Sequence, residues 1–177
     1  ALTGVGEPER LGGERVSASH FQMLGVSPAL GRTFLPGEDQ PGHARVVILS
    51  HGLWQRRFAA DPNVVGKAVL LNGQSHTGVG VMPSSYRLGH YGPQLWTALV
   101  FAPEIVLPEA RENRSLSVLA RLKSGVSVET AKAELAALAQ RSEKAHPGTS
   151  KGWGASAIPL QQYIADEFRV AMRMLMG

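Results

Sequence analysis

Apolar positions are most clearly patterned in one stretch of the N-terminal half. The apolar run 46–49 is too short for a helix and rich in β-branched residues, so it predicts a buried strand. Residues 51–58 predict a short helix, and residues 67–71 and 75–82 predict two strands. Asn72-Gly73 between them favours a type I′ hairpin turn, which needs positive φ at both central positions. Together these segments predict a β-α-β-β unit.

The preceding residues predict short framing elements. Residues 1–15 are polar and rich in glycine, which indicates an edge strand or a frayed terminus. Ser19 is a suitable N-cap for a helix over residues 20–24, and Gly25 is a suitable stop. Phe21 on this helix is expected to face the core.

Irregular segments lie on both sides of the central unit. Residues 26–34 predict a turn or short helix that directs Phe34 and Leu35 into the core. Residues 36–42 contain two prolines and two glycines and predict a loop. Residues 95–101 predict a further strand.

The C-terminal part predicts a strand, a helix and a second strand. Residues 115–122 alternate between apolar and polar positions, as a half-buried strand does. Ser127 is an N-cap for a helix over residues 128–145, and residues 155–160 predict a returning strand. The apolar face of this helix is expected to hold Val128, Ala131, Leu135, Leu138 and Ser142. From residue 161 a second apolar helix is expected, which contains three methionines.

Composition indicates a folded protein of one compact domain or two small lobes. Of the 177 residues, 44% are hydrophobic and 18% are charged. The net charge of +4 is spread along the chain, so it does not favour nucleic-acid binding but is compatible with an anionic lipid surface nearby. The lack of cysteine excludes disulfides and zinc-finger sites. The sequence contains no run of about 18 apolar residues, so no membrane span is predicted within it. The start without methionine indicates an excised fragment.

Sequence motifs with catalytic potential lack the context that they require. Residues 148–152 match G-x-S-x-G around Ser150, but a nucleophile elbow must follow a strand, and this one follows a helix. Gly66-Lys67 lacks the loop glycine of a phosphate-binding loop. The six histidines are not spaced as metal ligands. We therefore expect no catalytic, cofactor-binding or metal-binding residue.

Aromatic residues are expected mainly in the core. Trp54 and Phe58 lie four positions apart on the short helix and predict core contacts. Burial is also favoured for Trp96. Trp153 and Tyr163 are the candidates for a partner surface, although burial is the more frequent role of such residues.

Eight segments form a recognisable series along the chain: residues 16–26, 31–34, 46–50, 66–67, 71–73, 79–83, 120–127 and 157–160. In this order they resemble the MacB-type periplasmic core domain of ABC transporter permeases in the FtsX-like family, and the resemblance covers most of residues 14–162. Residues 54–58 and 61–63 resemble the orphan permeases of Acidobacteria.

The resemblance implies an α+β fold that is mixed, loop-rich and divided into two lobes. Residues 1–18 and 113–177 would form a porter-like β-α-β lobe, incomplete at its N-terminal side. Residues 19–112 would form an inserted mixed α/β lobe that contains the Asn72-Gly73 hairpin.

The resemblance also implies a function without catalysis. Such a domain lies on the periplasmic side of the bacterial inner membrane and transmits conformational change between transmembrane helices and a periplasmic substrate or partner. Its partners would be those helices, a cytoplasmic ATPase domain or subunit that holds the ATP, and a periplasmic adaptor protein. Two alternatives stay open: a stand-alone binding or adaptor domain, and a small serine hydrolase that uses Ser150.

Overall fold

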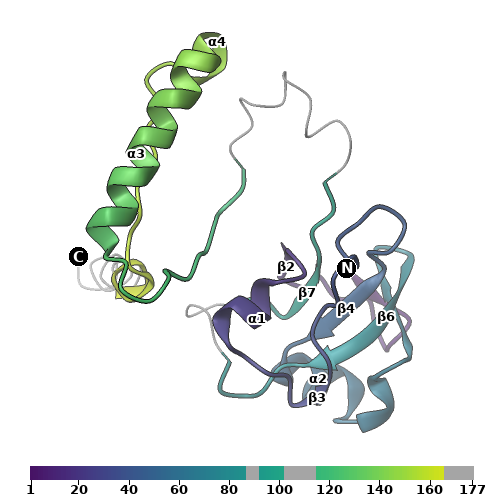
Figure 1. The fold of residues 1–177 in the computed structure, drawn as a ribbon. Coiled ribbons are helices and arrows are strands. Elements are labelled where there is room, and N and C mark those ends of the chain that lie inside the picture. Colours follow the sequence, from purple (N-terminus) through teal and green to yellow (C-terminus); the bar gives the residue numbers. More distant parts are fainter. Residues whose placement is uncertain (87–91, 102–114, 166–177) are drawn as a thin grey trace, which may run out of the picture. The chain divides into compact units, whose positions relative to one another are not determined.

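Strand β4 (Val46–Leu49) lies at the centre of a mixed sheet, and all four of its residues are buried (Figure 1). The computed structural model describes residues 1–86, 92–101 and 115–165. The chain divides into two compact units, Ala1–Glu104 and Ile105–Gly177, and the sheet belongs to the first.

The sheet has seven strands in the order β1-β5-β6-β4-β7-β2, with β3 paired to β6. Besides β4, these strands are β1 (Leu2–Thr3), β2 (Gly13–Val16), β3 (Leu30–Gly31), β5 (Ala68–Leu71), β6 (Gln74–Val81) and β7 (Leu95–Ala98). Strand β4 pairs in parallel with β6 and antiparallel with β7. The chain from β4 to β6 passes through helix α2 (His51–Phe58), a 3₁₀ turn η1 (Pro62–Val64) and β5, which confirms the predicted β-α-β-β unit.

The hairpin between β5 and β6 forms at the predicted turn. Asn72 and Gly73 have φ values of 52° and 76°, and Leu71 lies opposite Gln74. These are the two positive φ angles that a type I′ turn requires. The turn fixes which side chains of β6 lie on each face of the sheet.

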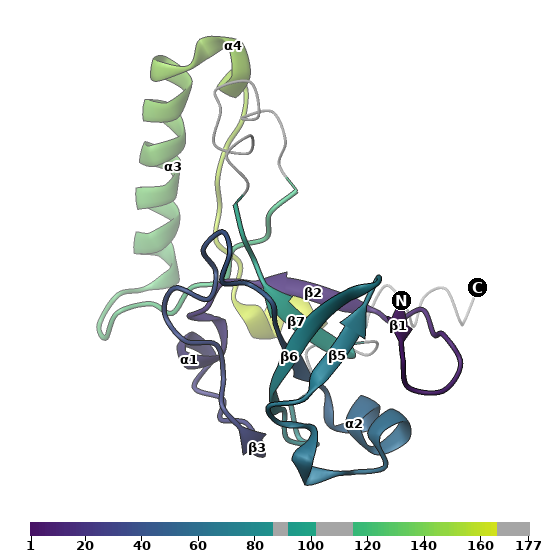
Figure 2. The same ribbon diagram turned by 90° about the vertical axis from the view of Figure 1, so that its right-hand side faces the viewer.

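Each face of the sheet carries its own core. One contains Val47 and Leu49 together with Leu53 of α2. The other contains Val46 and Ile48 together with Phe21 of helix α1 (His20–Leu24). Consecutive residues of a strand point to opposite faces, so β4 contributes two residues to each core. Figure 2 shows α1 and α2 at different sides of the strands.

The helix caps partly follow the sequence. Ser50 Oγ accepts a hydrogen bond of 3.2 Å from Leu53 N at the start of α2. Gly25 ends α1 in the left-handed region at φ 70°, as predicted. Ser19 precedes α1 but makes no side-chain capping bond, because its backbone is already helical (φ −79°, ψ −6°) rather than extended.

Leu35 was expected in the core, and that prediction is wrong. Phe34 is buried at 5% exposure, whereas Leu35 is 49% exposed. Leu35 N donates to Glu38 Oε2 at 2.8 Å, which holds the chain in a turn directly after Phe34. The segment 26–34 was expected to be a turn or a short helix; it contains no helix, and Leu30–Gly31 within it form β3. The strand expected over 95–101 ends at Ala98.

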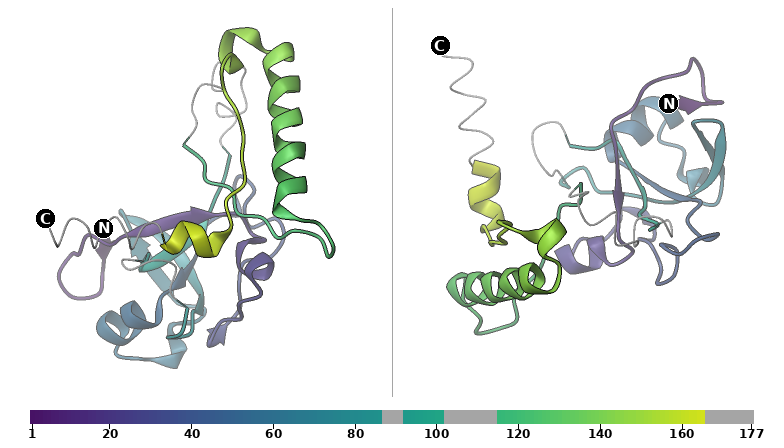
Figure 3. Two further views of the ribbon diagram at one scale, coloured as in Figure 1. Left: turned by 90° about the vertical axis from the view of Figure 1, so that its left-hand side faces the viewer. Right: turned by 90° about the horizontal axis from the view of Figure 1, so that it is seen from above.

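The second unit contains helix α3 (Val128–Ala145), with the bounds that the sequence predicted. Ser127 Oγ accepts a 3.1 Å hydrogen bond from Thr130 N, which confirms the predicted cap. A short helix α4 (Pro147–Ser150) follows, after which the chain turns back along α3 (Figure 3). Gly152 N donates to Glu143 Oε1 at 2.9 Å and fixes this turn.

The two strands predicted beside α3 are not formed. Residues 115–122 and 155–160 contain no strand, and every residue from 115 to 122 is exposed. Alternation describes side chains, whereas a strand also needs a partner for its backbone, and no described residue pairs with either segment. On α3 the half-buried positions are Val128, Ala131, Leu135, Ala139 and Glu143. Leu138, at 51% exposure, and Ser142 were expected on the apolar face but are exposed.

The apolar helix expected from residue 161 lies only partly within the described residues. Residues 160–165 are helical, but the rest of the expected apolar helix, with its three methionines, lies outside them. Within the described ranges, no helix combines the length and apolar character of a bilayer span. The two-lobe division, 1–18 with 113–177 and 19–112, stays a prediction.

Two glycines allow the backbones of β3 and β6 to approach closely. A Cβ on Gly80 would lie 2.3 Å from the carbonyl oxygen of Arg32. A Cβ on Gly31 would lie 2.2 Å from the carbonyl oxygen of Val79, and Gly31 also has φ +70°. Both atoms in the way belong to the backbone, so a side chain cannot be accommodated by a rotamer change.

We therefore expect Gly80→Ala to lower the free energy of unfolding by about 1–3 kcal/mol, as overpacking does elsewhere. Urea unfolding followed by tryptophan fluorescence measures this change. Gly52→Ala is the matched control, because Gly52 lies in α2 with open space around its Cβ position. The control is expected to leave stability unchanged or to raise it by up to about 1 kcal/mol. Equal stability of Gly80→Ala and the parent chain would contradict the close approach.

Candidate functional site

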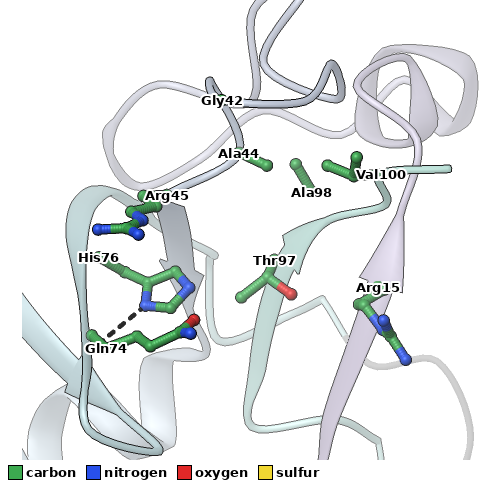
Figure 4. A pocket seen from close by; sticks show the side chains of 9 residues that line it. All are labelled: Arg15, Gly42, Ala44, Arg45, Gln74, His76, Thr97, Ala98 and Val100. Carbon is green, nitrogen blue, oxygen red and sulfur yellow. Dashed lines mark hydrogen bonds between the residues drawn. The ribbon is translucent and has the colours of Figure 1, made fainter. Parts of the chain in front are cut away.

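A polar groove of about 340 Å³ lies where β4 and β6 begin and where β2 and β7 end. Its lining residues come from four parts of the chain: Arg15, Gly42, Ala44, Arg45, Gln74, His76, Thr97, Ala98 and Val100. Figure 4 shows Arg45, His76 and Gln74 along one side, Arg15 on the opposite side and Thr97 between them. Ala44, Ala98 and Val100 line a third side.

The hairpin register places Gln74 and His76 in this groove. Gln74 lies opposite Leu71 and His76 lies opposite Val69. Leu71 and Val69 belong to the core that α2 covers, so all four side chains share one face of the sheet. The groove therefore continues the α2 face of the sheet, with polar residues in place of apolar ones.

The other side of the groove follows from the pairing of β2 with β7. Arg15 lies opposite Thr97, and Thr97 lies opposite Val47 on β4. Val47 belongs to the same core, which places Arg15 and Thr97 on the face of the hairpin residues. Glu14 precedes Arg15 on the strand and so points to the opposite face.

Positive charge dominates the groove. Arg15 and Arg45 are both exposed, and no carboxylate is among the nine lining residues. His76 is half-buried, and its Nδ1 lies 3.2 Å from the carbonyl oxygen of Gln74. Guanidinium groups bind carboxylates and phosphates through two parallel hydrogen bonds. The groove can therefore hold an anionic group.

The carboxylates of the loop before β4 are already engaged elsewhere. Arg32 donates to both oxygens of Glu38, at 2.7 and 2.9 Å. Partial burial raises the pKa of Glu38, but the hydrogen bonds from Arg32 and Leu35 N outweigh it and keep this pKa below its usual value. Asp39 Oδ2 accepts a hydrogen bond of 3.1 Å from Ala18 N.

The opposite face of the sheet carries an aromatic cluster, formed by His20, Phe21, Phe34, Tyr86 and Trp96. His20 Nε2 lies 3.3 Å from the Tyr86 hydroxyl. Burial lowers the pKa of His20. Burial, and secondarily the charge of Glu14, raises the pKa of Tyr86. Both groups are therefore held in their neutral forms, as expected of a packing cluster.

The aromatic candidates from the sequence have different positions. Trp96 is buried at 2% exposure, as favoured, and Trp54 and Phe58 pack against the α2 core. Trp153 and Tyr163 are 59% and 53% exposed, so burial is wrong for both. Their role as a partner surface stays a prediction.

The sequence motifs do not assemble a reaction site. Ser150 is the last residue of α4, which follows α3 directly, and its hydroxyl lies 3.3 Å from the hydroxyl of Ser142. This is not the strand–turn–helix geometry of a nucleophile elbow. Lys67 is paired with Asp61 at 3.0 Å. Within the described part of the chain, no three potential metal-ligating side chains form a cluster.

The groove residues were missed by sequence reasoning. The hairpin alone could have shown that Gln74 and His76 share a face with Val69 and Leu71. The neighbours of that face are strands β4, β7 and β2, which are distant in sequence. Arg15 and Arg45 carried no local signal that they would meet there.

Protonation of His20 is expected to destabilise the first unit. Because the pKa of His20 is lower in the folded chain, the unfolded chain takes up the proton more readily. Stability is therefore complete at neutral pH and falls as the pH drops below the unfolded value of about 6.5. Thermal melting at pH 7.5 and pH 5.5 should show a smaller loss of Tm in His20→Gln than in the parent chain. His43→Gln is the control, because His43 is exposed, and it should lose as much Tm as the parent chain. An equal loss of Tm in the parent chain and in both variants would contradict the destabilising role of His20 protonation.

Comparison with known proteins gives one consistent result. The family description "MacB-like periplasmic core domain" matches residues 3–138. A curated relative from Pseudomonas syringae pv. tomato, named "Probable syringafactin export ATP-binding/permease protein SyfD", is 31% identical over 125 residues. The match covers 70% of this chain but only 18% of that relative, so the chain spans about a fifth of its length.

Two solved structures match parts of the chain. The periplasmic region of MacB from Actinobacillus actinomycetemcomitans superposes with a TM-score of 0.50 at 16% identity, covering 77% of this chain and 57% of that chain. The extracellular domain of the noncanonic ABC-type transporter YknZ from Gram-positive bacteria gives a TM-score of 0.39 at 18% identity, over 48% of this chain and 41% of the other.

Proposed function

Because the chain belongs to the family of MacB-like periplasmic core domains, we propose that it transmits conformational change in an ABC transporter permease. In this role it connects transmembrane helices of the parent permease to a substrate or partner in the periplasm. The observation that carries the proposal is the family match, which spans residues 3–138 and includes both the sheet and most of α3.

The construction of the first unit suits a mechanical role. Strand β4 is paired on both edges and covered on both faces, so the first unit has two cores that share one strand. Close-packed interiors resist compression and transmit displacement. A force applied to one edge of such a sheet moves the whole first unit.

The chemistry of transport is assigned to other parts of the permease. We propose that ATP is bound and hydrolysed on a cytoplasmic domain or subunit, and that this chain itself is not catalytic. Ser150 at a helix end and Lys67 paired with Asp61 support that assignment, since neither stands in the context that catalysis or phosphate binding needs. A periplasmic adaptor protein is the proposed further partner.

The direction of transport is proposed to be export. The curated relative is named for syringafactin export, and the shared part of the two proteins is this domain. We propose that the domain lies on the periplasmic side of the inner membrane, where an exported substrate emerges. The chemical identity of that substrate is a property of the whole permease.

Nucleotide-dependent motion of the domain tests this function. The chain has no cysteine of its own, so spin labels can be attached at introduced cysteines in an otherwise cysteine-free domain. In the parent permease, Gln55→Cys on α2 and Glu134→Cys on α3 place one label on each unit, both at exposed positions. We expect the measured label–label distance to differ between the nucleotide-free and the ATP-bound, vanadate-trapped permease.

A label pair within the first unit provides the control. Gln22→Cys on α1 and Gln55→Cys on α2 are both exposed and both belong to the sheet-containing unit. Their distance is expected to stay constant, because the first unit moves as one body. If the distance between the labels on α2 and α3 also stayed the same in every nucleotide state, that result would contradict the proposed coupling.

A further inference from the structure

The groove at the strand ends has an excess of positive charge, and no carboxylate of the described residues lines it. Its lining includes Arg15, Arg45 and His76. Of the acidic side chains in the loop before β4, Glu38 is bound to Arg32, and Asp39 accepts from Ala18 N. Glu14 points to the opposite face of the sheet, beside Tyr86. Exposed arginines of this kind are available for an external anion.

The spacing of the positive groups indicates an extended ligand. Arg15 is on β2 and Arg45 directly precedes β4, with β7 between the two strands. Two steps across a sheet amount to roughly 10 Å between backbones. Arg15 and Arg45 lie on opposite sides of the groove (Figure 4), so a single phosphate contacts both only if their side chains turn toward each other. Two carboxylates four positions apart lie on the same face of an extended peptide and are separated by about 13 Å, a span that the long arginine side chains can match.

The neutral lining residues favour a peptide as the carrier of those carboxylates. Thr97 lies between the two arginines, and Gln74 lies beside His76 on the side of Arg45 (Figure 4). The side chains of Gln74 and Thr97 can both donate and accept hydrogen bonds. Backbone amide groups of a peptide require such partners. Ala44, Ala98 and Val100 are small, so the groove stays wide enough for a chain to lie across the strand ends.

We propose that this groove binds an extended acidic segment of a partner protein. One carboxylate of the segment pairs with Arg15, a second pairs with Arg45 beside His76, and Gln74 and Thr97 bind the backbone between them. The proposal adds a docking site to the domain and does not depend on nucleotide-driven motion. Its failure would leave the spin-label result unaffected, and the reverse also holds.

Peptide binding to the 177-residue chain tests the proposal. The probe is a fluorescein-labelled eight-residue peptide with two glutamates four positions apart in a glycine-serine background, and fluorescence anisotropy measures its affinity. The comparison peptide has glutamine at both positions. We expect the glutamate peptide to bind at least tenfold more tightly, because charge-assisted hydrogen bonds are roughly twice as strong as neutral ones.

Charge reversal in the groove identifies the site. Arg15→Glu and Arg45→Glu are each expected to weaken binding of the glutamate peptide about tenfold or more. Arg45 is exposed and lies outside the strands, so its variant keeps the test decisive if Arg15→Glu folds poorly. Lys132→Glu on α3 makes the same change in net charge at an exposed position of the second unit and is expected to bind normally.

Three results would overturn the proposal. The first is equal affinity for the glutamate and glutamine peptides, and the second is unchanged binding in both groove variants. The third is binding of a different anion at the same site. Phosphatidylglycerol vesicles that bind through the same two arginines, or inorganic phosphate that displaces the peptide at equal concentration, would show this. Binding of the glutamate peptide that is lost in both groove variants, without competition from vesicles or phosphate, supports the acidic segment.

Discussion

The pairing of β4 on both edges is the constraint on which the rest of the first unit depends. Val46–Leu49 bonds to β6 on one side and to β7 on the other, and its side chains enter both cores. Burial of each such apolar side chain contributes about 1.5–3 kcal/mol. Both ends of β4 are held as well, since Thr77 N donates to Arg45 O and Met82 N donates to Leu49 O, each at 2.8 Å.

The groove and the aromatic cluster are two consequences of the same arrangement. Strand β6 pairs with β4 only from Thr77 onward, so Gln74 and His76 extend beyond the start of β4. On the face covered by α2, the sheet extends past the helix, and Arg15, Thr97 and His76 replace apolar residues there. On the other face, α1 and Tyr86 cover the sheet with aromatic rings. One face therefore offers a polar surface, while the opposite face is closed by packing.

The sequence was most informative where local chemistry determines conformation. The run 46–49, the Asn72-Gly73 turn and the Ser127 cap each act within a few residues, and each produced the element it predicts. Residues 115–122 and 155–160 failed, because alternation cannot supply a backbone partner. Leu35 failed because the Glu38 hydrogen bond, not hydropathy, sets its direction.

The functional surface was the least accessible to sequence reasoning. Trp153 and Tyr163 attracted attention as large aromatic residues, and both are exposed. The groove is instead built from common polar residues whose proximity depends on the order β6-β4-β7-β2. That order joins strands far apart in sequence, from 31 positions between Val46 and Thr77 to 82 positions between Arg15 and Thr97. The proposed role of the domain rests on family membership, since no single residue indicated it.

Native-state hydrogen exchange of the backbone amides tests the central claim, that the first unit is one cooperative body built around β4. The account predicts that the amides of β4 and of its neighbours on β6 and β7 exchange most slowly, with a common free energy equal to that of global unfolding. Amides of α3, which has no fully buried residue, should exchange through smaller openings. Exchange of β4 as fast as that of α3, or with a free energy well below that of global unfolding, would contradict the account.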